Sequence, residues 1–185
     1  MLRTRLIHPG GVTVITPERL YRDHRGFFLD ARRSNEYMDL TAGLEFVQSN
    51  FSVSVPFTLR GLHYQLGRPM QGKLLRCISG KIFQVSVDMR AGSPNFGTWA
   101  GTILDGTANE SVWVPPGFAN GFFAFEQGAV VHYDMTAYYS QELERAVRWD
   151  DPVIGIQWPM GIGAQVVLSA KDRTTPLLSE AAPWE

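Results

Sequence analysis

Hydrophobic and polar residues alternate along several short segments of this chain, most clearly from Phe46 to Val55. Successive side chains of an extended segment point to opposite faces, so a period of two predicts a β-strand. Here one face collects polar side chains and the other apolar ones, and only Ser49 breaks the apolar side. The polar face carries Gln48, Asn50, Ser52 and Ser54, and the apolar face carries Val47, Phe51, Val53 and Val55.

Further strands are predicted at Lys81–Met89, Ser111–Pro115 and Ala129–Met135, where alternation or a wealth of Val, Tyr and Trp favours extended structure. Turn residues such as Ser79-Gly80-Lys81 separate the candidate strands. Helical patterns are few: a short helix is predicted over Ser34–Leu40 with Ser34 as its cap, and one turn over Ser140–Glu144. Many short strands with close turns indicate an all-β sandwich or barrel.

Length, charge and cysteine content indicate a single domain and exclude several classes of protein. The 185 residues predict one domain, residues 1–185, with room for a sizeable core. There are 17 basic and 18 acidic side chains and no charged run, which argues against a nucleic-acid or membrane-surface partner. The single cysteine, Cys77, excludes a disulfide framework, and no apolar segment is long enough to span a membrane. We therefore expect a cytoplasmic protein.

Two residues in strand-like segments are candidates for chemistry. His63 lies in the segment Arg60–Gln65, and Lys73 follows ten residues later in Gln71-Gly72-Lys73, just before an apolar run. A lysine held against apolar surface is costly unless it meets an anion, although a strand-end lysine that extends its ammonium to solvent is a common alternative. A lone histidine is more often structural than catalytic.

The sequence lacks the residues that a metal site, a serine hydrolase or a phosphate-binding loop would need. Metal-binding histidines usually have a second histidine or a carboxylate nearby, whereas Gln65 stands two residues after His63 and no acid occurs from there to Gly80. Hence no metal site is expected. The chain also has no Gly-x-Ser-x-Gly elbow and no glycine-rich phosphate loop.

From Val12 to Leu178 the chain resembles the dTDP-4-dehydrorhamnose 3,5-epimerase family, a metal-free branch of the cupins. Each matching segment is weakly specific alone, but together and in this order they make a strong signal. The segments are Asp23–Phe28, Phe46–Asn50, Leu59–Gln65, Gln71–Arg76, Val87–Arg90, Ser93–Gly97, Val114–Ala119, Tyr133–Tyr139, Trp149–Pro152, Ile156–Pro159 and Leu168–Asp172.

The resemblance implies a cupin-type double-stranded β-helix, or jelly roll, with a few short helices. It implies no cofactor, a small nucleotide-sugar substrate that carries dTDP, and a homodimer that exchanges N-terminal strands. The substrate's 4-keto group acidifies the protons on C3 and C5, so epimerisation needs a base on one ring face, an acid on the other and a cation for the enolate. By resemblance His63 is the base, Asp172 its partner, Lys73 the cation and Tyr133 the acid.

Binding roles follow from the same resemblance. Arg25 and Lys171 match positions near the pyrophosphate and nucleotide, and Tyr139 matches the position that stacks on the base. The remaining implied substrate-binding positions are Asp30, Gln48, Asn50, Arg60, Asn120, Tyr138 and Glu144. The polar face of residues 46–55 independently supports Gln48 and Asn50.

This chain departs from the family pattern at three positions. Asn120 stands where the family usually has a histidine, Gln84 where it has an aspartate, and Asp30 where it has a glutamate. An Asp-His pair that becomes a Gln-Asn pair keeps hydrogen bonding and loses both ionisations. We therefore expect Gln84 and Asn120 to be in contact.

Three alternatives to the 3,5-epimerase interpretation stay open. One is an epimerase that acts at C3 only or on another nucleotide-linked 4-keto sugar, since His63, Lys73, Tyr133 and Asp172 are all present. The second is a non-catalytic module that binds sugar nucleotides. The third is a metal-dependent cupin oxygenase, for which Gln65 and Asn120 replace expected histidine ligands.

Overall fold

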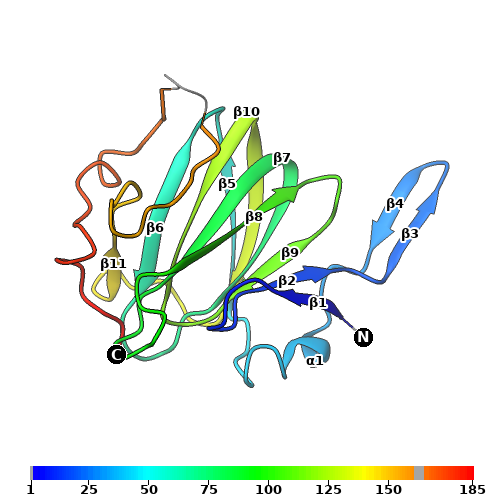
Figure 1. Cartoon of the computed structure of the whole chain (residues 1–185). Helices are drawn as coiled ribbons and strands as arrows, with labels where there is room; N and C mark the ends of the chain where they lie inside the picture. The colour runs from blue at the N-terminus through cyan, green and yellow to red at the C-terminus, as the bar shows by residue number, and fades with distance from the viewer. Residues whose placement is uncertain (1, 161–164) are drawn as a thin grey trace.

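The computed structural model describes residues 2–160 and 165–185, and nearly all of their regular structure is β-strand. Two long antiparallel strands, β7 (Lys73–Asp88) and β10 (Phe118–Met135), pair along most of their length. The first half of β10 pairs with β6 (Leu59–Gln65), whereas its second half pairs with β5 (Gln48–Ser54). The two long strands therefore take part in two layers (Figure 1).

Each layer is built on one half of the long pair. In the first layer β8 (Trp99–Asp105), β6 and β11 (Glu144–Ala146) join residues 81–88 of β7 and 118–124 of β10. In the second, β5, β9 (Ser111–Val114), β2 (Thr13–Thr16) and β1 (Arg3–Leu6) join the other halves. This antiparallel arrangement confirms the predicted all-β jelly roll of cupin type.

Apolar side chains from both layers meet in the main core. Leu75 and Val131 of the second layer pack in one cluster with Ile82 and Phe122 of the first. A second cluster covers the outer side of the first layer, where Tyr64 and Val85 share it with Leu178 of the C-terminal segment. Together these clusters hold the two layers rigidly around the space between them.

The strand β5 lies within the predicted segment 46–55, but its polar face is turned to the interior and its apolar face to the outside. Gln48, Asn50 and Ser52 point inward and are partly buried, whereas Phe51 and Val53 are 69% and 73% exposed. An antiparallel strand normally buries its apolar face and exposes its polar one. This strand therefore offers polar groups to the interior and an apolar surface to the outside.

A two-stranded hairpin of β3 (Leu20–Asp23) and β4 (Gly26–Leu29) projects from the body of the molecule (Figure 1). The short helix α1 (Ser34–Tyr37) follows it, inside the range predicted from sequence. Ser34 is the first helical residue and not the cap, because the extended residue Arg33 precedes the helix and Ser34 instead accepts a hydrogen bond from Arg32. Residues 141–143 form a turn that leads directly into β11, as expected of a single turn there.

No helix within residues 2–160 and 165–185 has the length and apolar character needed to cross a membrane.

Candidate active site

A cavity with both polar and apolar walls opens between the two layers and has two adjoining lobes of about 230 and 360 Å³. His63, Lys73 and Tyr133 line both lobes, so these three side chains stand at the centre of the cavity. Other residues of the first lobe are Ser52, Arg60, Leu75, Asn120, Gly121, Phe122, Ser169, Lys171 and Asp172. Those of the second are Gln48, Asn50, Phe51, Tyr64, Gln65, Gln71, Met135, Tyr139 and Glu144.

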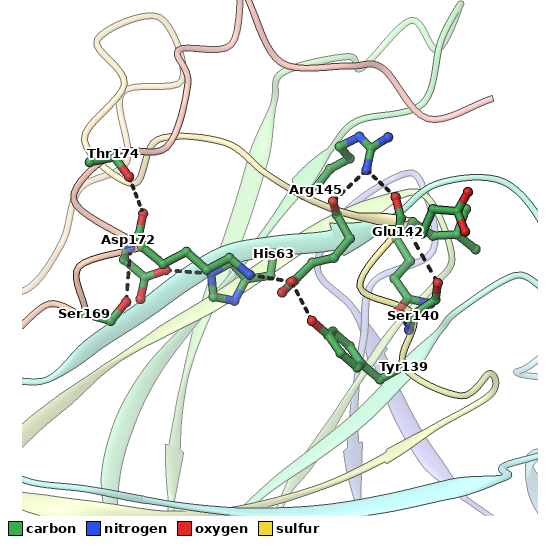
Figure 2. A network of polar contacts seen from close by, with 12 residues as sticks. His63, Tyr139, Ser140, Glu142, Arg145, Ser169, Asp172 and Thr174 are labelled. Atoms are coloured by element: carbon green, nitrogen blue, oxygen red, sulfur yellow. Dashed lines mark hydrogen bonds and ion pairs between the residues drawn. The ribbon is translucent and has the colours of Figure 1, made fainter.

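His63 and Asp172 form a hydrogen-bonded pair on the first-layer side of the cavity. Nε2 of His63 lies 2.6 Å from Oδ1 of Asp172, and the backbone N–H of Asp172 donates to Oγ of Ser169 at 3.0 Å. Burial raises the pKa of Asp172, but hydrogen bonds from His63, Ser169 and the backbone of Gly61 outweigh it, so the net pKa lies below the usual value. Asp172 therefore stays ionised and directs the Nε2 proton of His63 toward itself, which leaves Nδ1 as the basic atom. Figure 2 shows this pair beside the neighbouring polar network.

Glycines let the strand of His63 approach β10 closely. Gly61 has a φ of +135°, and a Cβ there would lie 2.6 Å from the Cα of Gly121. Only glycine fits such an approach at such a φ. The contact sets Asn120 directly opposite His63 in the strand register, with an irregularity before Phe122.

Lys73 reaches the cavity from the start of β7, in the second layer. Its Nζ donates to the backbone carbonyl of His63 at 3.4 Å, and no carboxylate of the described residues lies within ion-pair distance of it. Burial lowers the pKa of Lys73 to about 8, although the carboxylate of Glu144 opposes the shift. A partly buried ammonium with spare donors is suited to a negatively charged oxygen of a ligand.

Tyr133 faces His63 from the opposite layer. It lies in the second half of β10, where it pairs with Asn50 of β5 and Leu75 of β7. Burial raises the pKa of Tyr133, against the opposing effect of Arg60, so the phenol keeps its proton at neutral pH. The cavity therefore presents a proton acceptor on one side and a proton donor on the other.

A polar rim continues from this centre toward the outside. Gln48 donates to Asn50 at 3.1 Å and accepts from the backbone N–H of Tyr139 at 2.8 Å. The hydroxyl of Tyr139, which Figure 2 labels, donates to Glu144 at 2.9 Å. Glu144 also forms an ion pair with Lys171. The rim thus offers an exposed aromatic ring, amides and an ammonium along the edge of the cavity.

Comparison with known proteins places these features in a family. A family model described as dTDP-4-dehydrorhamnose 3,5-epimerase matches residues 8–180. The chain belongs to the dTDP-4-dehydrorhamnose 3,5-epimerase family. It is 41% identical to the dTDP-4-dehydrorhamnose 3,5-epimerase of Salmonella typhimurium over 171 residues, which cover 92% of both chains.

Solved structures of similar proteins agree with this family. The epimerase from Legionella pneumophila, solved with dTDP-4-keto-L-rhamnose, has a TM-score of 0.91 and 40% identity, over 97% of this chain and 94% of that one. A 3′-monoepimerase from Streptomyces bikiniensis, solved with dTDP-quinovose, has a TM-score of 0.84 and 30% identity, over 91% of this chain and 84% of that one. The fold is therefore shared by epimerases of different regiochemistry.

Most of the site residues expected from the epimerase family gather in this cavity, but three lie outside its lining. Arg25 is exposed at the hairpin tip, where its guanidinium pairs with Asp23 at 2.6 Å. Asp30 follows the hairpin and pairs with Arg33. Tyr138 is 69% exposed, and its backbone carbonyl accepts a hydrogen bond from Gln65 at 3.3 Å.

The expected contact between the two departures from the family pattern is confirmed. Nε2 of Gln84 donates to Oδ1 of Asn120 at 2.8 Å, and Gln84 is fully buried. Asn120 lines the cavity beside His63, so a neutral amide occupies the place of an ionisable side chain.

Sequence reasoning missed three residues that support the site. Gln65 and Gln71 bond to the backbone of residues 137–140 and so fix the segment that carries Tyr139. Ser169 holds the backbone of Asp172, and its signal was the Ser-x-x-Asp spacing typical of a side-chain-capped turn. For Gln65 and Gln71 the available signal was a glutamine in, or just before, a segment that is expected to form a strand.

Within residues 2–160 and 165–185, no three or more His, Cys, Asp or Glu side chains come together in a way that could hold a metal ion.

Proposed function

We propose that this protein is a nucleotide-sugar epimerase that inverts C3 and C5 of a dTDP-linked 4-keto-6-deoxyhexose. One observation carries the proposal: the His63–Asp172 pair and Tyr133 face the same cavity from opposite layers, and the ammonium of Lys73 lies in that cavity beside His63. Inversion of a carbon next to a ketone needs this two-sided arrangement, since the proton leaves one face and returns to the other.

Each step uses one of these residues. Nδ1 of His63 takes the proton from C3 or C5, and the electron pair moves to the C4 oxygen to give an enolate. Lys73 stabilises that oxygen, and the ionised Asp172 stabilises the imidazolium. The phenol of Tyr133 then protonates the same carbon on the opposite face, and solvent restores both side chains.

Substrate binding is proposed for the rim and for the remaining cavity residues. Tyr139 offers its ring to the base, and Lys171 offers an ammonium to the diphosphate once Glu144 releases it. Gln48, Asn50, Arg60 and Asn120 line the cavity and are proposed to bind the sugar, and Glu144 of the same lining is proposed for the nucleotide end. Tyr138, exposed outside the cavity lining, is proposed to flank that end as well.

A homodimer completes the proposal. The projecting hairpin exposes Tyr21, Phe27 and Phe28, and the outer face of β5 exposes Phe51 and Val53. The hairpin is rooted beside that same layer, because Arg76 of β7 donates to the backbone of Ala31 and Arg32 pairs with Asp134 of β10. An isologous pair buries both apolar surfaces and brings Arg25 and Asp30 toward the partner's cavity. A cytoplasmic location stays a prediction of this proposal.

Exchange with solvent deuterium tests the reaction. The protein is incubated with dTDP-4-keto-6-deoxyglucose in D2O, and deuterium at C3 and C5 is followed by NMR. Deuterium at both carbons supports the proposal, deuterium at C3 alone supports a monoepimerase, and no deuterium contradicts epimerisation of this substrate. Metal analysis of the same active preparation separates the cupin oxygenase alternative, which requires a bound metal.

A further inference from the structure

Asn120 is held in one orientation by a fully buried neighbour. Gln84 uses both protons of its amide, toward Oδ1 of Asn120 at 2.8 Å and toward Oγ of Ser86 at 2.7 Å. Its own Oε1 is buried and has no partner among residues 2–160 and 165–185. The reverse orientation of Gln84 would leave two buried N–H donors unpaired, which is less favourable than one unpaired carbonyl.

This arrangement decides which atom Asn120 presents to the cavity. Since Oδ1 accepts from Gln84, the NH2 group is left to face the cavity, and within the described residues it has no hydrogen-bond partner. Asn120 and His63 are register partners on adjacent strands, so their side chains lie next to each other on the same face. The amide is therefore an uncharged donor on the side of the base, at any pH at which the protein is folded.

We propose that Asn120 determines specificity by donating a hydrogen bond to the C3 hydroxyl of the sugar, with Gln84 as the positioning residue that keeps the donor turned into the cavity. The inference rests on the proposed function. Of the groups on the reacting carbons and the carbonyl between them, the C4 oxygen is taken by Lys73, and C5 carries an apolar methyl group and the ring oxygen, an ether that lies away from C3 across the ring. The C3 hydroxyl is the acceptor that remains beside the carbon that His63 deprotonates.

The test pairs each variant with two substrates, dTDP-4-keto-6-deoxyglucose and its 3-deoxy analogue. Deuterium exchange at C5 is measured for both, because both carry that proton. For Asn120→Ala we expect kcat/KM to fall about 3- to 10-fold with the hydroxylated substrate and less than about twofold with the analogue. Asn120→Asp keeps the shape of the side chain and the hydrogen bond from Gln84 but has no donor. This variant should therefore also lose the preference for the hydroxylated substrate over the 3-deoxy analogue.

Gln84→Met tests the positioning role, because methionine cannot donate to Asn120. We expect the same loss of preference for the hydroxylated substrate, whereas general damage to the fold would lower both rates equally. The inference is overturned if kcat/KM falls equally for the two substrates in all three variants, or falls in none of them. Deuterium exchange by the wild-type protein would still support the epimerase function in that case. If the wild type exchanges neither substrate, the proposed function fails and takes this inference with it.

Discussion

Nε2 of His63 and Oδ1 of Asp172 lie 2.6 Å apart, although 109 positions separate the two residues in the chain. The carboxylate is buried, which raises its pKa, but the hydrogen bond and attraction from His63, with further hydrogen bonds from Ser169 and the backbone of Gly61, together hold the pKa of Asp172 below the usual value. Such a pair fixes both the tautomer and the orientation of the imidazole. The basicity of Nδ1 in the cavity therefore depends on Asp172.

Asp172→Asn should lower kcat/KM by about 10²- to 10⁴-fold, because an amide can donate to Nε2 and so move the imidazole proton to Nδ1. Steady-state kinetics measure the loss. Asp150→Asn is the control, since Asp150 pairs with Arg148 on the surface and is absent from the cavity lining. A loss of less than about threefold for Asp172→Asn would show that His63 does not need the carboxylate.

The pH dependence should report Lys73. Its pKa is lowered to about 8 by burial, and the catalytically useful form is the protonated one. Activity that needs the ammonium is present below this pKa and is lost as the pH rises through about 8, so kcat/KM should decline on the alkaline side. In Lys73→Arg the side chain stays charged at alkaline pH, so the decline of kcat/KM should disappear even if the variant is slower than the wild type at every pH. A wild-type profile that stays flat to high pH would contradict this role.

Alternation along the chain predicted where the strands lie, but it did not show how they join. The turn signal at Ser79-Gly80-Lys81 lies inside β7, because the strand continues through it from one layer to the other. Likewise the pattern at 46–55 separated polar from apolar side chains and could not say which face is inside. Burial depends on partners distant in sequence, and here the polar face lines the cavity.

Local patterns were also insufficient for the site. His63 and Lys73 stood out in the sequence, whereas Asp172 and Tyr133 entered through the family resemblance. The fold brings all four together from β6, β7, β10 and the C-terminal segment, at separations that no spacing rule covers. The contact of Gln84 with Asn120 was predictable because an aspartate and a histidine of the family pattern are both replaced by amides, which suggests a compensated pair.

Gly61→Ala should lower the free energy of unfolding by about 1–3 kcal/mol and reduce activity. The added Cβ would lie 2.6 Å from the Cα of Gly121, at a φ of +135° that disfavours any side chain. Urea denaturation measures the stability. Gly92→Ala is the matched control, because Gly92 also has a positive φ but no atom of the described residues lies within 4 Å of the added Cβ. Equal losses in the two variants would mean that close strand approach is unimportant.

Heterodimers can show whether the hairpin serves the partner's cavity. Arg25→Ala should by itself lower kcat/KM about 10-fold, since a charge-assisted hydrogen bond is lost, and His63→Ala should be inactive. A heterodimer of one Arg25→Ala chain and one His63→Ala chain, purified through two different tags, would then contain one intact site if the hairpins are exchanged. We expect about half of the wild-type activity per dimer. Activity of only a few per cent would place Arg25 outside the partner's site.

The two-sided proton transfer is tested most directly by comparing His63→Asn with Tyr133→Phe in D2O, with deuterium and configuration determined by NMR at C3 and C5. Tyr133→Phe keeps the base, so recovered substrate should gain deuterium with its configuration retained while inversion is lost. His63→Asn should show neither exchange nor inversion at either carbon. Exchange that persists in His63→Asn, or inversion at the wild-type rate in Tyr133→Phe, would contradict the assignment of base and acid to opposite layers of the cavity.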